Sequence, residues 1–222
     1  EKILLSWSGG KDSAMALYRL LQEGRYEVLA LLTTMTRDYD RISMHGVRRE
    51  LLRRQADSLG IPLEELWITK GAGNEEYEAA VRHVLVKYQG FGVKRVAFGD
   101  LFLEDLRAYR EKNLARIGME GLFPVWGKDT PAFAREFIRL GFRATLVCVD
   151  TVKVPDAFAG RAFDDALLGE FPEGVDPCGE NGEFHTFVWA GPIFREPVEF
   201  SLGEIRKDGQ FCFRDLVPAA VP

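Results

Sequence analysis

The sequence has 222 residues, 46% of them hydrophobic and 28% charged, an ordinary balance for a folded domain with an apolar core. The formal net charge of -5 argues against generic nucleic-acid binding, because contact with a phosphate backbone needs clustered Lys and Arg. Cys148, Cys178 and Cys212 form no CxxC pair, which argues against a disulfide framework or a thiolate zinc site and favours a reducing, cytoplasmic compartment. A strand pattern starts at once, and no apolar run reaches the ~18 residues of a membrane span, so we expect neither a signal peptide nor a membrane partner.

Short apolar runs alternate with helical patterns in the first half of the chain. Strands are expected at residues 3–7, 28–32, 63–69 and 93–98, and helices at residues 14–21, 47–59 and 77–88. This alternation predicts an α/β domain built on a parallel sheet. Such sheets bind ligands beyond the carboxyl ends of their strands. Four segments are expected to meet at that edge: residues 8–10, 33–34, 70–71 and 99–100.

The second half of the chain has a different pattern. The expected elements are helices at 103–117 and 133–140, a strand at 144–149, a loop at 171–182, and antiparallel strands at 184–189, 197–205 and 210–216. We therefore predict two domains, residues 1–118 and a smaller α+β region at residues 119–222, with a boundary near Gly118.

The most informative segment lies between the first strand and the first helix. Gly9 and Gly10 let the backbone approach an anion closely, and the free amides and positive dipole of a helix start bind phosphate. Asp12 cannot help a bare anion, so near phosphate it makes most sense as a Mg²⁺ ligand or in fixing the loop. The other candidates supply hydroxyl groups and one positive charge: Ser6, Ser8, Lys11 and Ser13.

This loop is not a Walker A motif, because Leu5 stands where that motif needs Gly, and Asp12 follows the lysine where it needs Ser or Thr. The Ser-Gly-Gly-x-Asp-Ser pattern resembles the PP-loop of the N-type ATP pyrophosphatases. The resemblance implies that the loop holds the departing pyrophosphate and exposes the α-phosphorus of ATP to attack. The alternative is a Gly-rich turn followed by a chance helix cap.

Further segments resemble the diphthine–ammonia ligase family over residues 2–194. They are residues 43–46, 55–63, 99–100, 121–126, 141–144 and 179–187, of which the last is the most specific. The resemblance implies a Rossmann-like, HUP-type parallel sheet with helices on both faces, and an enzyme that uses ATP and Mg²⁺. It also implies that ATP adenylates the carboxylate of diphthine on elongation factor 2, and that ammonia then displaces AMP. Free ammonium is the simplest nitrogen donor, and a homodimer is left open.

Residues 104–114 depart from the archaeal and eukaryotic pattern of this family and lack its Cys. The stretch resembles a bacterial branch, in which the acceptor would differ. Two alternatives therefore stay open: a nucleotide-binding or sensing module without ligase turnover, and another PP-loop enzyme with a different acceptor such as tRNA. The missing CxxC pairs and the acidic balance count against tRNA thiolation.

Further site candidates lie at the ends of the predicted strands. Gly99 and Asp100 follow the fourth strand, where Asp100 could bind metal or acceptor, or simply form a turn or helix cap. Thr33 and Thr34 end the second strand, where the fold of the resembled family places adenine; strand-end packing is the alternative.

Two histidines and a glutamate complete the candidate site. Glu183 and His185 alternate along a strand and should share one face, where they could position ammonia, deprotonate ammonium, bind the acceptor or form a structural pair. His45 opens the second helix and could contact nucleotide or acceptor, or be structural.

Overall fold

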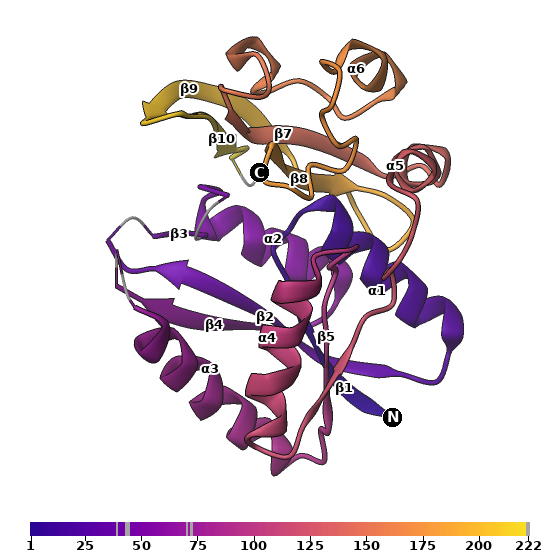
Figure 1. The fold of residues 1–222 in the computed structure, drawn as a ribbon, viewed down its shortest axis with the longest axis vertical. Helices are drawn as coiled ribbons and strands as arrows, with labels where there is room; N and C mark the ends of the chain where they lie inside the picture. Colours follow the sequence, from indigo (N-terminus) through magenta and orange to yellow (C-terminus); the bar gives the residue numbers. More distant parts are fainter. Residues whose placement is uncertain (39, 43–44, 70, 72, 221–222) are drawn as a thin grey trace.

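The computed structural model describes residues 1–38, 40–42, 45–69, 71 and 73–220 and contains two β-sheets with helices around them (Figure 1). The first sheet comprises β1 (Lys2–Ser6), β2 (Glu27–Thr36), β3 (Arg41–Ile42), β4 (Leu63–Ile68), β5 (Arg95–Ala97) and β6 (Glu120–Leu122). The second comprises β7 (Arg143–Asp150), β8 (Phe184–Ala190), β9 (Phe200–Asp208) and β10 (Phe211–Pro218). The helices are α1 (Lys11–Glu23), α2 (Arg49–Leu59), α3 (Asn74–Gln89), α4 (Glu104–Ala115), α5 (Thr130–Arg139), the 3₁₀ turn η1 (Asp156–Phe158) and α6 (Asp165–Glu170).

The first sheet confirms the predicted α/β architecture. β2 pairs in parallel with β1 and β4, and β5 pairs in parallel with β1 and β6, while the short β3 runs antiparallel to β2. The chain thus moves outward from β1 through β2 to β4 and then returns to the other side of β1 at β5. This reversal is the switch point at which open α/β sheets bind ligands.

Helices cover both faces of the first sheet. Ile3 and Leu5 point to one face and pack with buried residues of α1 and α2, whereas Leu4 points to the other face and packs with α3 and α4. Gly24 and Gly60 end α1 and α2 in the left-handed conformation, with φ of 66° and 70°, which allows the chain to turn back into the next strand.

The second sheet is antiparallel, in the order β8-β7-β10-β9, and lies above α1 and α2 in Figure 1. One buried apolar cluster runs from β1, α1 and α2 into β7, β8 and α5, so the two sheets share a core. β6 follows the predicted boundary near Gly118 in the sequence and still pairs with β5 in the first sheet. No helix among the described residues is long and apolar enough to cross a membrane.

Candidate functional site

The predicted phosphate loop connects β1 to α1 at the carboxyl edge of the first sheet. Gly9 has a φ of +76°, and a Cβ there would lie 2.7 Å from Gln55 Oε1, so the position requires glycine. Gly10 N–H donates to Ser8 Oγ (3.2 Å), and Ser13 Oγ donates to the Gly10 carbonyl (2.9 Å). α1 begins after Gly10 without a side-chain cap. A glycine-rich turn leading into a helix whose N-cap residue supplies no side chain is a geometry that binds anions.

The second sheet holds this loop from outside. The Gly9 carbonyl accepts a hydrogen bond from the Val188 amide (2.9 Å), and the Lys11 amide donates to Thr186 Oγ1 (3.1 Å). Val188 and Thr186 both belong to β8. The conformation of the loop therefore depends on residues more than 170 positions away in the sequence.

Gln55 of α2 ties the two sheets to the loop, and it is a residue to which the sequence analysis gave no role. Its side chain is fully buried (0% exposed). Its Nε2 donates to the carbonyls of Gly9 (3.0 Å) and Val188 (2.5 Å), and its Oε1 accepts from Trp7 Nε1 (3.0 Å). The available signal was a polar residue on the apolar face of α2, beside Leu51 and Leu52.

Lys11 points into the protein and away from solvent. Its side chain is buried, and Nζ donates to Asp12 Oδ2 (2.9 Å) and to the Cys178 carbonyl in the loop before β8. Burial lowers the pKa of Lys11, but Asp12 and its other neighbours outweigh this effect and leave the pKa raised. Burial raises the pKa of Asp12, in opposition to Lys11. Asp12 Oδ1 has no hydrogen-bond partner within the described part of the chain.

The segment after β5 packs tightly against the phosphate loop. A Cβ at Gly99 would lie 2.8 Å from backbone atoms of Asp12 and Ser13, so the absence of a side chain here has a packing reason. Asp100 forms an ion pair with Arg110 of α4 (2.7 Å between Oδ2 and Nε). The carboxylate of Asp100 thus has a partner within the protein, and its role in binding metal or acceptor stays a prediction.

Glu180 joins the loop before β8 to the same region. Its Oε1 accepts a hydrogen bond from the Leu101 amide (2.7 Å). Burial raises the pKa of Glu180 to about 7, and the nearby Asp12 adds to this rise. The sequence analysis assigned Glu180 no catalytic or binding role. Its position beside the phosphate loop, together with its raised pKa, marks it as a further candidate.

Glu183 and His185 have different surroundings. Glu183 precedes β8 and is 3% exposed, and its Oε1 accepts from the Asp176 amide (3.3 Å) and from Asn181 Nδ2 (3.2 Å). It therefore shapes the loop of residues 176–183. His185 stacks on His45, with ring centroids 4.4 Å apart. Burial and Lys11 lower the pKa of His185 to about 4, and burial and His185 lower the pKa of His45.

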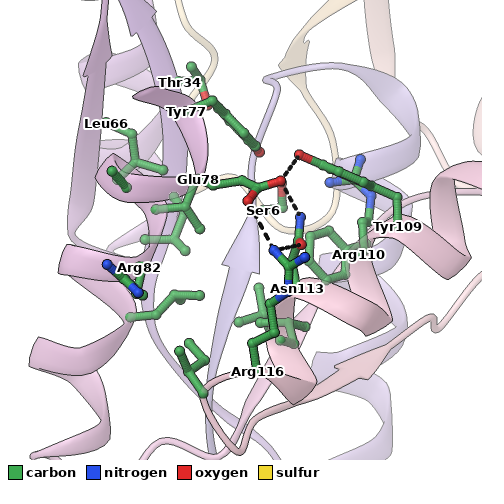
Figure 2. A pocket seen from close by; sticks show the side chains of 18 of the residues that line it. Ser6, Thr34, Leu66, Tyr77, Glu78, Arg82, Tyr109, Arg110, Asn113 and Arg116 are labelled. Atoms are coloured by element: carbon green, nitrogen blue, oxygen red, sulfur yellow. Dashed lines mark hydrogen bonds and ion pairs between the residues drawn. The ribbon is translucent and has the colours of Figure 1, made fainter. Parts of the chain in front are cut away.

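A cavity of about 280 Å³ lies between α3 and α4 (Figure 2). Ser6 and Thr34 lie at one end, where β1 and β2 reach the carboxyl edge of the sheet. Across the cavity, Glu78 of α3 contacts Tyr109 (3.0 Å) and Asn113 (3.4 Å) of α4 and Arg116 (3.1 Å), which directly follows α4. The floor is apolar and includes Leu32, Leu66, Val96 and Phe98. Thr33 is not part of this lining: it is 1% exposed, and its hydroxyl donates to the Trp7 carbonyl (2.7 Å).

The structure thus divides the predicted site residues between two places. The loop residues, Gly99 and His185 surround the start of α1, while Ser6 and Thr34 line the cavity on the other face. Ser43, Met44 and Lys70, which belong to predicted segments, lie outside the described residues. No group of three or more metal-ligating side chains occurs among the residues that the structure describes.

Comparison with known proteins identifies both parts of the chain. Residues 1–121 match the model of the diphthamide synthase N-terminal domain, and residues 129–217 match that of the diphthamide synthase C-terminal domain. A diphthine–ammonia ligase of Danio rerio is 27% identical over 92% of this chain and 89% of its own length. The human diphthine–ammonia ligase is 24% identical over 89% of this chain and 82% of its own length.

Two further matches differ in extent. The diphthine–ammonia ligase of Schizosaccharomyces pombe is 23% identical over 96% of this chain, which spans only 38% of that protein. Among solved structures, a U34-tRNA thiolase of Methanococcus maripaludis with its 4Fe-4S cluster matches 63% of this chain and 57% of that chain, with 16% identity and a TM-score of 0.36.

Proposed function

This chain belongs to the diphthamide synthase family, and we propose that it is an ATP-dependent ligase that adenylates a carboxylate, releases pyrophosphate and amidates the product with ammonia. The observation that carries the proposal is the phosphate loop at the β1–α1 junction, which β8 holds in place. The name shared by the curated relatives, diphthine–ammonia ligase, supplies the carboxylate and the nitrogen donor.

ATP would span the two places where the site residues gather. The outer phosphates would bind at the start of α1, where Gly9, Gly10 and the helix dipole favour an anion. The adenine would enter the cavity beside Ser6 and Thr34, whose hydroxyls can meet the polar edge of a base while the apolar floor contacts its faces. The α-phosphorus would then lie near the switch point between β1 and β5.

Asp12 would hold Mg²⁺. Its Oδ1 is buried and has no hydrogen-bond partner among the described residues, and a single carboxylate oxygen suits an ion that takes its other ligands from phosphates and water. When bound, the ion would supply positive charge to the phosphates. Lys11 lies beside Asp12 with its ammonium directed at the Cys178 carbonyl, so it stabilises the acidic surroundings of the loop.

The chemistry follows from the weakness of a carboxylate as an electrophile. Attack of the carboxylate oxygen on the α-phosphorus forms an acyl-adenylate and expels pyrophosphate. Ammonia then attacks the acyl carbon, AMP leaves with the C–O bond electrons, and a proton passes to solvent or to a nearby base. Holding acceptor and ATP together removes much of the entropic barrier. We propose that residues 1–118 bind ATP and residues 119–222 recognise the acceptor, diphthine on elongation factor 2, in the cytoplasm.

The test identifies the phosphate products of the reaction and measures whether oxygen passes from the carboxylate to AMP. The enzyme is incubated with Mg·ATP, ammonium and diphthine-bearing elongation factor 2 whose diphthine carboxylate carries oxygen-18, and the products are followed by ³¹P NMR. The proposal expects AMP and pyrophosphate, with one oxygen-18 atom transferred to AMP. Formation of ADP and phosphate, or unlabelled AMP, would contradict it. If ATP binds and no carboxylate triggers exchange of pyrophosphate into ATP, the chain is a nucleotide-binding module without turnover.

A further inference from the structure

His45 and His185 come from segments far apart in the sequence and meet beside the phosphate loop. His45 precedes α2, and His185 lies in β8. Their rings stack with centroids 4.4 Å apart and an interplanar angle of 29°. Two imidazoles at this distance cannot both be in the positively charged imidazolium form without strong repulsion. The protonation of one ring therefore affects the pKa of the other, and the pair titrates as a coupled unit.

The pair lies next to Gly10, the last residue before α1. A Cβ at Gly10 would lie 3.4 Å from His45 Cε1, 3.3 Å from Ser8 Oγ and 3.1 Å from the Thr186 carbonyl. Because Gly10 lacks this Cβ, a narrow space remains between the loop and the imidazole. His45 Nδ1 is buried and has no hydrogen-bond partner among the described residues.

The surroundings keep both rings neutral before a ligand arrives. Burial is the largest effect on both imidazoles and disfavours their charged forms, and the ammonium of Lys11 acts in the same direction. At His45 the ring of His185 adds to this effect, while a backbone hydrogen bond at Thr186 opposes it. As a result, the pKa of His185 is about 4 and that of His45 lies below its usual range. Phosphates at the start of α1 would bring several negative charges close to the two rings. These charges would favour the imidazolium form and raise the pKa of the pair.

We propose that His45 and His185 form one proton-accepting unit that contacts the outer phosphates of the bound nucleotide and takes up one proton when these phosphates arrive. This inference rests on the proposed function, since it requires the triphosphate at the β1–α1 loop. The proton comes from solvent and forms an N–H on one imidazole, while the second ring stays neutral and stabilises the cation through the stack. The imidazolium then faces the departing pyrophosphate and offsets its negative charge, and the proton returns to solvent when pyrophosphate leaves.

The chain has three histidines, which makes the proposal directly testable by NMR. The Cε1–H signals of the full chain are titrated from pH 4 to 9, free and saturated with Mg²⁺ and α,β-methylene-ATP, which cannot be cleaved between its α- and β-phosphates. His83 is exposed on α3 and serves as the internal reference. We expect the titration midpoint of the His45–His185 pair to rise by about one pH unit or more, because an opposite charge within ~4–6 Å has an effect of this size. The midpoint of His83 should not move.

Several outcomes would overturn the proposal. One is saturation by the analogue without any movement of the paired midpoints; the proposed function would survive that result. Another is an equal rise with AMP, because AMP carries no outer phosphates. Failure of the analogue to bind at all would instead refute the proposed function, and the inference with it.

Calorimetry with variants provides an independent measurement. Binding of the analogue at about pH 5, above the pKa of about 4 for His185 in the free protein, should show net proton uptake in buffers of different ionisation enthalpy. This uptake is expected for the wild type and for His83→Asn. The double variant His45→Asn/His185→Asn keeps polar side chains of similar size and should lose this uptake. Persistent uptake in the double variant would contradict the proposal.

Discussion

Replacing Gln55 with leucine would show how strongly the phosphate loop depends on its buried contacts. Gln55→Leu removes three hydrogen bonds, those to Trp7, Gly9 and Val188. The Gly9 carbonyl keeps its bond from the Val188 amide, whereas the indole N–H of Trp7 is left buried without the partner it has in the wild type. A leucine fills a similar volume, so the main change is the loss of polar partners.

The expected cost follows from these contacts. The two lost hydrogen bonds to carbonyl groups cost ~1 kcal/mol each, and the orphaned indole N–H costs ~1–3 kcal/mol, so the free energy of unfolding should fall by about 3–5 kcal/mol. Because Gly9 is part of the loop, the affinity for Mg²⁺ and α,β-methylene-ATP should fall by about tenfold or more, which corresponds to ~1.4 kcal/mol. Gln55→Glu should be at least as damaging at pH 7, since its carboxylate would face the carbonyl oxygens of Gly9 and Val188.

Urea unfolding followed by circular dichroism and calorimetric titration with the analogue measure the two effects. The matched control is Ser58→Ala on the same helix. Ser58 Oγ donates to the Glu196 carbonyl (2.6 Å) and accepts from the Glu196 amide (3.1 Å), and neither bond involves the loop. This variant should therefore lose ~2 kcal/mol of stability and keep its nucleotide affinity. The reasoning fails if Gln55→Leu unfolds within about 0.5 kcal/mol of the wild type, or if both variants weaken nucleotide binding equally.

Three further changes test other parts of the site. Gly99→Ala should cost about 1–3 kcal/mol of unfolding free energy and weaken nucleotide binding, because the new Cβ would lie 2.8 Å from the Asp12 backbone; Gly169→Ala, with open space around it, is the control in the same urea assay. Asp12→Asn should abolish Mg·ATP cleavage in a pyrophosphate-release assay and lower stability by about 3 kcal/mol, since buried Lys11 loses its counter-ion; unchanged cleavage would exclude Asp12 as the metal ligand. The pKa of Glu180, raised to about 7, predicts that the free energy of unfolding falls by up to about 3 kcal/mol as pH rises from about 4.5 to 7, because the native state holds a proton that the unfolded chain has released. Glu180→Gln should remove this dependence of stability on pH. If the dependence is unchanged in the variant, another group causes it.

Most of the first sheet could be predicted because its strands are buried and its helices amphipathic. β1, β2, β4 and β5 appear at the predicted places, each within a few residues of the expected bounds. β3 and β6 were missed, since two and three residues are too short to show a hydrophobic period. β9 was expected three residues too early, because most of its residues are exposed and give no alternating pattern.

In the candidate site, features formed by residues adjacent in the sequence could be predicted, whereas contacts between distant segments could not. The bend of the phosphate loop could be predicted, because Gly9 and the following helix are adjacent in the sequence. The contacts of Gln55 with Val188 and of His45 with His185 could not, because they depend on how β8 docks against the first sheet. Glu183 was expected to share a strand face with His185; in the structure its Oε1 accepts hydrogen bonds that close the loop of residues 176–183, and a joint role with His185 stays a prediction.

The hydrogen bond between Val188 and the Gly9 carbonyl has a consequence for how this protein can vary. A strand from the second half of the chain completes a turn encoded in the first ten residues. Fusing the first half to an unrelated protein would keep the sequence of the phosphate loop but remove the hydrogen bond from Val188 that holds it. In chimaeras of distant relatives, the phosphate loop and β8 should therefore come from the same parent protein.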